Sequence, residues 1–279
     1  MNSLKYLAPP LLVDAAAIGR DIARTFAHGR SLARNKVHYN SCDGQAVFVI
    51  GNGPSLTDIN LSLLLPAFPC ITCNYFGIHP LAKSLNIVAH CTGDPATKVF
   101  NKHVVDGLAG VDAPAYWLHY SSSNYVPREF RSRAFFYLPS SSPFSAHISG
   151  YSLAAAALPY QSTVQMSISV ALYMGFKRIY LIGCDHDWLC CGQFTSHFYD
   201  PEPGVSHPSA ASGDFSRFSY SDMIDISGRL FSHYRRLGRV AGRLGAKIVN
   251  ASSKSYLDVF ERRSYERCIS EEQELIRNS

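Results

Sequence analysis

The sequence predicts an α/β fold, a single Rossmann-like domain with a mostly parallel sheet and helices on both faces. Two observations lead to this fold class. Short apolar runs alternate along the chain with helix-compatible segments, and the first run, residues 47–50, continues directly into a glycine-rich turn. Such alternation is typical of parallel sheets covered by helices, because each parallel strand needs a long crossover connection.

The expected strands are short runs of apolar and β-branched residues. They comprise residues 47–50, 70–73, 87–91, 116–120, 134–138, 178–183 and 247–250. The clearest helix covers residues 163–174, with Ser162 or Thr163 as its N-cap and Gly175 after its last turn. A second long helix is expected over residues 220–244, with many arginines on its outer side.

Composition indicates an ordinary globular protein. The 279 residues and 47% hydrophobic content are sufficient to bury a substantial core. The net charge of +5 is mild and contains no concentrated basic block, so no nucleic-acid partner is expected. This charge suits anionic substrates or an anionic membrane surface.

The eight cysteines lie mostly inside apolar segments and show no recurring zinc-site spacing. Cys70 and Cys73 share one predicted strand, where alternation directs them to opposite faces of the sheet. We therefore expect reduced thiols in a cytoplasmic protein. No stretch reaches the roughly 18 to 20 apolar residues that a membrane span requires.

The N-terminal segment is expected to be helical over residues 14–36. Ile18, Ile22 and Phe26 recur at four-residue spacing, and arginines supply positive charge around them. Such a helix could lie on an anionic membrane surface, which would make the protein peripheral on the inner membrane. The alternative, which we favour, is a helix docked on the domain.

The turn Gly51-Asn52-Gly53-Pro54-Ser55 follows the first predicted strand. Glycine permits close backbone approaches, and proline suits the first position of a helix. Free amides at a helix start attract anions, so this turn is a candidate phosphate site. It lacks the spacing of the Walker and dinucleotide-binding loops, and a tight strand-to-helix connection remains an equal alternative.

A dense group of acids and bases follows the strand that ends at Gly183. It contains Asp185, His186 and Asp187, and then His197 and Tyr199. A histidine can accept a proton from an attacking hydroxyl, and a tyrosine hydroxyl can donate to a phosphate oxygen. The Asp-x-Asp pattern could also hold a divalent cation, although three residues make a weak motif.

Several blocks of the sequence resemble known enzymes. The blocks are residues 51–55, 73–76, 162–185 and 247–260. They are similar to the bacterial sialyltransferases of glycosyltransferase family 42. They are equally similar to the MptE-like superfamily, which is related to 6-hydroxymethylpterin diphosphokinase. The resemblance covers about residues 46–262.

The resemblance implies a metal-independent enzyme without a cofactor that transfers a nonulosonic sugar from a CMP-activated donor to a glycan, with inversion. Asn52 and Asn74 would contact the donor, Asp94 takes the place of a donor-contacting asparagine, and Thr163 takes the place of a helix-capping serine. The expected catalytic residues are His197, His186 and Asp185. The expected nucleotide-binding residues are Gly51, Asn52, Gly53, Pro54, Ser55, Asn74, Asp94, Ser162, Thr163 and Tyr199.

Two departures from the family pattern leave the base and the donor open. Pro201 stands where the second histidine of a His-x-x-x-His stretch would fall, and Tyr160 replaces an arginine. The base is therefore His197 or His186, with His207 third. The donor could be CMP-sialic acid, CMP-Kdo or another CMP-sugar.

The resemblance also suggests the organisation of the chain. We expect an N-terminal helical extension over 1–44, a nucleotide-sugar-binding catalytic domain over 45–262 with a lid over 186–216, and a C-terminal helix or tail over 263–279. The expected partners are a nucleotide sugar and a bacterial surface glycan such as lipopolysaccharide, and the chain could form a homo-oligomer. Two alternatives are a Mg-dependent diphosphokinase, with Asp185 and Asp187 on the metal, and a non-catalytic nucleotide-binding protein.

Overall fold

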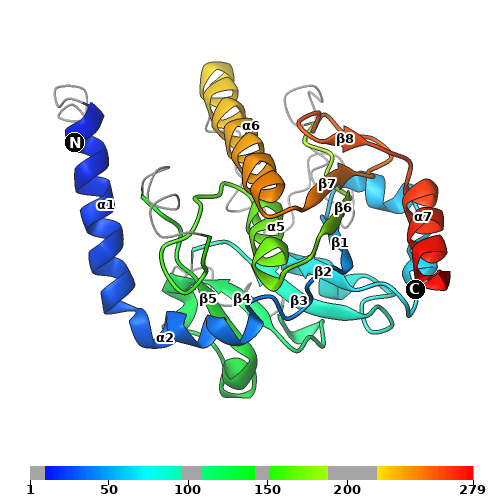
Figure 1. The fold of residues 1–279 in the computed structure, drawn as a ribbon, viewed down its shortest axis with the longest axis horizontal. Helices are drawn as coiled ribbons and strands as arrows, with labels where there is room; N and C mark the ends of the chain where they lie inside the picture. Colours follow the sequence, from blue (N-terminus) through cyan, green and yellow to red (C-terminus); the bar gives the residue numbers. More distant parts are fainter. Residues whose placement is uncertain (1–9, 96–107, 142–150, 188–218, 279) are drawn as a thin grey trace.

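The computed structural model describes residues 10–95, 108–141, 151–187 and 219–278. In these residues an eight-stranded sheet has the order β5-β4-β3-β2-β1-β6-β7-β8, and every neighbouring pair is parallel (Figure 1). The predicted α/β class with a Rossmann-like parallel sheet is confirmed.

Each of the predicted strands is present, and one short strand is added. The strands are β1 (Ala46–Ile50), β2 (Cys70–Cys73), β3 (Ile87–Thr92), β4 (Tyr116–His119), β5 (Ala134–Tyr137), β6 (Arg178–Ile182), β7 (Lys247–Asn250) and β8 (Glu261–Arg262). The main helices of the described residues are α1 (Pro10–Ala27), α2 (Gly29–Ala33), α5 (Thr163–Met174), α6 (Tyr220–Arg243) and α7 (Tyr265–Arg277). Short 3-10 helices include η2 (Arg34–His38), η3 (Pro54–Asp58), η4 (Leu61–Leu64), η5 (Asn74–Ile78), η6 (Tyr120–Asn124) and η7 (Arg128–Arg133).

Helix α5 begins and ends as the sequence predicts. The Ser162 hydroxyl accepts a hydrogen bond from the Gln165 amide, which makes Ser162 the N-cap. Gly175 follows the last turn with a φ of 93°, a left-handed conformation that favours glycine. Every residue of α5 is buried, so this helix forms the centre of one covering layer.

The sheet separates two hydrophobic cores. One face packs against α5 and α6 and includes Val47, Val49 and Cys73. The other packs against α7 and the loops after β1 and β2, and it includes Phe48 and Cys70. Cys70 and Cys73 therefore lie on opposite faces, as strand alternation predicts.

The N-terminal segment docks on the edge of the sheet beside β5. Leu32 is fully buried, and the Asn35 side-chain amide donates to the carbonyls of Phe136 (2.8 Å) and Leu153 (2.6 Å). The Asp21 carboxylate accepts a hydrogen bond from the Ser141 amide at 2.9 Å. These contacts show that the N-terminal segment is docked on the domain.

The N-terminal helix does not dock on the domain through the apolar residues Ile22 and Phe26 of its predicted stripe. Ile22 and Phe26 are 54% and 83% exposed. Two of the arginines instead point to the domain, where Arg24 donates to the Pro139 carbonyl at 3.1 Å and Arg34 to the Ser132 carbonyl at 2.8 Å. Within the described ranges, no helix combines the length and apolar character that crossing a bilayer requires.

Candidate functional site

The candidate site lies where the chain reverses its direction across the sheet. From β1 the chain proceeds through β2, β3, β4 and β5 on one side, and it then returns to β6 on the other side of β1. In open α/β sheets, ligands bind at such a switch point, beyond the carboxyl ends of the strands. The glycine-rich turn after β1 and the acidic segment after β6 both lie there.

The glycines of this turn allow it to pack against the end of β6. A Cβ at Gly51 would lie 2.3 Å from the Gly183 carbonyl oxygen, and one at Gly53 would lie 2.6 Å from the Asp185 carboxyl carbon. The amides of Gly51 and Gly53 donate to the carbonyls of Ile182 and Gly183, both at 2.8 Å. Close backbone approach, rather than an unusual φ, is what requires glycine here.

The anion at the start of η3 comes from the chain itself. The Asp185 carboxylate accepts hydrogen bonds from the Ser55 amide, at 2.8 Å, and from the Ser55 hydroxyl. The amides of Gly51, Gly53 and Ser55 all donate within the chain, and the binding of a phosphate by this turn stays a prediction. Pro54 does occupy the first position, but η3 is a short 3-10 helix.

Asp185 is 6% exposed, and burial raises the pKa of its carboxyl more than the Ser55 hydrogen bonds lower it. Both carboxylate oxygens already accept hydrogen bonds, which leaves Asp185 poorly placed as a metal ligand. Within the described part of the chain, no three His, Cys, Asp or Glu side chains cluster as a metal site.

Asn52 extends from the turn toward β2. Its side-chain nitrogen donates to the Cys73 carbonyl at 3.0 Å, and the residue is 7% exposed. Its side-chain oxygen is buried and accepts no hydrogen bond from the described residues. A buried acceptor without a donor is costly, so this oxygen is a suitable contact for a ligand that donates a hydrogen bond.

Asn74 links β2 to the start of α5. It has a φ of 50°, a left-handed conformation that asparagine tolerates better than most residues. Its side-chain oxygen accepts a hydrogen bond from the Thr163 hydroxyl at 3.2 Å, and the Thr163 oxygen accepts one from the Gly93 amide at 3.3 Å. This chain of contacts holds the exits of β2 and β3 against the N-terminus of α5.

Asp94 follows that contact at the exit of β3. Tyr160 fixes the preceding turn by donating to the Gly93 carbonyl at 2.6 Å. The Asp94 carboxyl makes no hydrogen bond or ion pair with the described residues, and burial raises its pKa. Asp94 is thus a second hydrogen-bond acceptor without a partner at the same edge of the sheet.

His186 contacts a residue that the sequence did not single out. Its Nε2 atom lies 2.6 Å from the Tyr234 hydroxyl, which is also 3.2 Å from the Ser162 hydroxyl. Burial lowers the pKa of His186 from 6.5 to about 4, so the imidazole is neutral at neutral pH. Tyr234 lies on the buried face of α6, where a tyrosine hydroxyl requires a hydrogen-bond partner. Its position on the apolar side of the predicted helix was therefore the sequence signal that could have identified it.

The structure brings together Asn52, Asn74, Asp94, Thr163 and Asp185 at the carboxyl edge of the sheet, with Ser162 and His186 joined through Tyr234. Two further expected residues, His197 and Tyr199, lie outside the described residues, as do His207 and most of the predicted lid.

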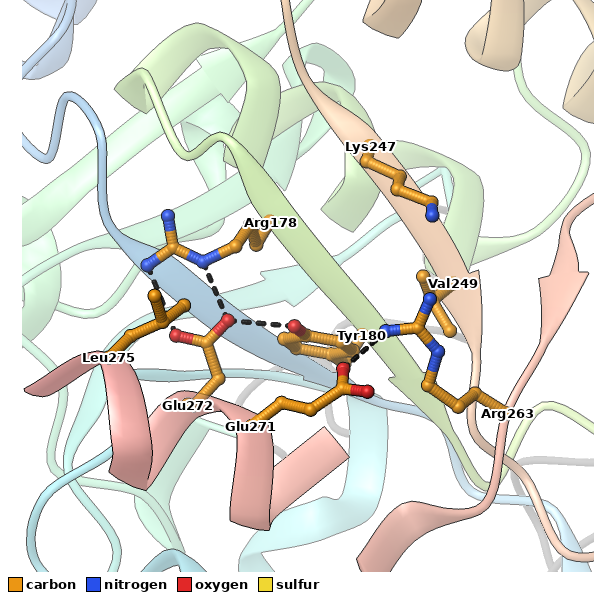
Figure 2. A pocket seen from close by; sticks show the side chains of 8 residues that line it. All are labelled: Arg178, Tyr180, Lys247, Val249, Arg263, Glu271, Glu272 and Leu275. Atoms are coloured by element: carbon orange, nitrogen blue, oxygen red, sulfur yellow. Dashed lines mark hydrogen bonds and ion pairs between the residues drawn. The ribbon is translucent and has the colours of Figure 1, made fainter. Parts of the chain in front are cut away.

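A separate pocket of about 120 Å³ lies under α7. Arg178 and Lys247, the first residues of β6 and β7, line it, so it is remote from the carboxyl ends of the strands. Figure 2 shows Arg178 paired with Glu272 and Arg263 paired with Glu271. Glu272 accepts from Arg178 at 2.6 Å and from Tyr180 at 2.7 Å, and Glu271 pairs with Arg263. This pocket is part of the packing of α7.

Comparison with solved structures finds bacterial glycosyltransferases. The sialyltransferase CST-II, in complex with trisaccharide acceptor and CMP, has a TM-score of 0.44 and 17% identity over 78% of this chain and 85% of its own. CstII from Campylobacter jejuni, in complex with cytidine-5'-monophosphate, has a TM-score of 0.42 and 16% identity over 80% and 86%. The MAf glycosyltransferase from Magnetospirillum magneticum AMB-1 has a TM-score of 0.47 and 16% identity over 90% of this chain and 42% of its own.

The chain is similar in structure to these bacterial transferases. At identities of 16% to 17%, the likeness extends to the fold alone. No protein-family model matches the sequence, and no curated protein matches it.

Proposed function

We propose that the chain is a glycosyltransferase that moves a nonulosonic sugar, such as sialic acid or Kdo, from a CMP-activated donor to a glycan hydroxyl with inversion. The observation that carries the proposal is the convergence of separate sequence blocks at one edge of the sheet. Asn52 bonds to the residue before Asn74, and Asn74 bonds to Thr163. These three residues belong to the blocks that resemble family 42 sialyltransferases.

The described part of the site suits the hydrogen-donating parts of a nucleotide sugar. The Asn52 side-chain oxygen and the Asp94 carboxyl are acceptors without a partner among the described residues. Hydroxyls of a sugar and the amino group of cytosine are donors. Binding of the donor there would satisfy both groups, which is a source of affinity and of selectivity.

The proposed reaction is a direct displacement. His197 takes the proton of the acceptor hydroxyl while its oxygen attacks the anomeric carbon, and the bond to the phosphate oxygen breaks to release CMP. The Tyr199 hydroxyl would donate a hydrogen bond to the departing phosphate. We assign the base to His197 because His186, with a pKa lowered to about 4 and Nε2 next to Tyr234, is a weak base.

A magnesium-dependent diphosphoryl transfer has less support. It needs Asp185 as a metal ligand, and both oxygens of that carboxylate accept hydrogen bonds from Ser55. Its carboxyl also has a raised pKa, which opposes the charged form that Mg²⁺ requires. Metal dependence of nucleotide binding therefore separates the two reactions.

Calorimetry of the full chain with CMP, UMP and AMP tests the donor class. In EDTA we expect CMP to bind most tightly, and Asn52→Ala and Asn74→Ala to weaken it at least about tenfold, equivalent to one lost hydrogen bond. The exposed Asn124→Ala is the matched control and should bind as wild type. Tighter binding of UMP or AMP, or binding that requires Mg²⁺, would reject the proposal.

Release of CMP from CMP-sialic acid and CMP-Kdo tests the chemistry. His197→Ala should lower turnover far more than donor affinity, because a base acts in the transition state. Equal losses in turnover and in donor affinity would show that another residue is the base. His186→Ala is the second variant to compare.

A further inference from the structure

The outer face of α6 presents a row of arginines that the proposed reaction does not use. We call Arg229, Arg235, Arg236 and Arg239 the arginine face. At about 100° per residue they spread over about 120° of the outer side of the helix, whereas Leu230, Tyr234 and Leu237 lie on its buried side. Residues 229–243 contain no acidic residue.

The charges of the arginine face are not compensated within the described structure. None of its members takes part in an ion pair or side-chain hydrogen bond with the described residues. By contrast, Arg133 and Arg178 each meet a carboxylate at 2.6 Å. Three members of the face are exposed, and Arg236 is half-buried.

The arginines of this face repel one another. Burial and then the charge of Arg239 lower the pKa of Arg236. Burial, followed by the charges of Arg236 and Arg229, also lowers the pKa of His233. An anionic partner would relieve this repulsion, so the face is complementary to negative charge.

The shape of the face favours an extended partner. Residues 229–243 span about 21 Å of helix, and a helix surface is convex, so it cannot enclose a single small anion. The apolar side chains Tyr220 and Ile224 are 71% and 49% exposed at the start of the same helix. They lie beside Asp222 and Asp225, so attraction to an anionic lipid surface comes from the arginines of residues 229–243, at about 1 kcal/mol per arginine.

We propose that the arginine face of α6 binds the surface of an anionic lipid bilayer. The inner face of the same helix carries Tyr234, which contacts His186 and Ser162, so binding would hold the candidate site close to the lipid. The membrane-facing element is then α6 rather than the N-terminal segment, whose Arg24 and Arg34 bond to carbonyls of the domain. Binding by this face does not depend on the donor nucleotide.

Vesicle co-sedimentation of the full chain tests this proposal. Wild type should bind vesicles that contain phosphatidylglycerol and not vesicles of phosphatidylcholine alone, and 1 M salt should release it because the Debye length falls from about 10 Å to about 3 Å. The triple variant Arg229→Gln, Arg235→Gln and Arg239→Gln should bind on the order of 100-fold more weakly, at about fivefold per arginine.

The matched control removes the same charge elsewhere. Lys36→Gln, Lys83→Gln and Arg128→Gln replace three exposed cations that make no ion pair or side-chain hydrogen bond with the described residues, and binding should change less than about threefold. Replacing the three α6 arginines by lysine should preserve binding, which separates loss of charge from loss of fold.

Three results would overturn the proposal. The first is binding of the glutamine triple at wild-type strength. The second is binding of soluble polyphosphate without binding of anionic vesicles, which would indicate a soluble polyanion. The third is loss of vesicle binding in Arg20→Gln with Arg30→Gln while the α6 triple retains it, which would return the role to the N-terminal segment.

Discussion

Removing the Asp185 carboxylate should destabilise the protein, whereas neutralising it should not. Asp185→Ala leaves the amide and hydroxyl of Ser55 without their acceptor. Asp185 and Ser55 are 6% and 3% exposed, so water replaces the lost bonds poorly. Each unsatisfied buried group costs about 1 to 3 kcal/mol, and we expect a loss of about 3 kcal/mol in the free energy of unfolding.

Asp185→Asn keeps the shape of the side chain. The amide oxygen can accept from the Ser55 amide, and the amide nitrogen can donate to the Ser55 hydroxyl. Burial raises the pKa of the carboxyl, so the charged form is already disfavoured at this position. We therefore expect Asp185→Asn to remain within about 1 kcal/mol of wild type.

Urea unfolding measures both variants, with Ser55→Ala as the control that removes only the hydroxyl bond and costs about 1 to 2 kcal/mol. Asp185→Ala as stable as wild type, with an unchanged m value, would refute this reasoning. Equal losses in the alanine and asparagine variants would show that the charge itself is required. If Asp185→Asn is stable yet inactive, the catalytic role that the sequence predicted is retained.

Three further predictions concern other positions. Gly51→Ala should cost more than about 3 kcal/mol in urea unfolding, because its Cβ would lie 2.3 Å from a backbone oxygen, whereas Gly19→Ala, with open space around it, should stabilise α1 by up to about 1 kcal/mol. Tyr234→Phe should shift the imidazole NMR signals of the neighbouring histidine and cost about 1 kcal/mol; unchanged signals would contradict the contact. Stability should fall from pH 6.5 toward 4, because the unfolded chain binds more protons there, and a flat profile of urea midpoints would contradict it. The histidines whose pKa burial lowers to about 4 are His90, His119 and His186.

The buried strands were predictable because each of them is a short apolar stretch that can be recognised in the sequence itself. β1 and residues 179–182 of β6 are runs of apolar residues, and both faces of the sheet are covered. The two residues of β8, Glu261 and Arg262, are exposed and carry no such signal. That strand is defined by pairing with β7, which no local pattern reveals.

The main features of the site that the sequence did not predict depend on contacts between residues far apart in the chain. Ser55 and Asp185 are 130 positions apart, and Tyr234 is 48 positions from His186. The sequence correctly placed a glycine-rich turn at the exit of β1 but could not show that the anion beside it belongs to the same chain. Sequence identifies groups that can bind; only the fold shows which groups are already bound.

Because several polar groups of the site are already bonded within the chain, fewer of them remain to contact the donor nucleotide of the proposed reaction. With the amides of Gly51, Gly53 and Ser55 engaged, the turn after β1 has little left to offer a phosphate. Among the groups without partners there, the Asn52 oxygen and the Asp94 carboxyl are acceptors, whereas the Thr92 hydroxyl can also donate. In the proposed enzyme, the base and sugar hydroxyls of the nucleotide would therefore be directed toward the acceptors Asn52 and Asp94.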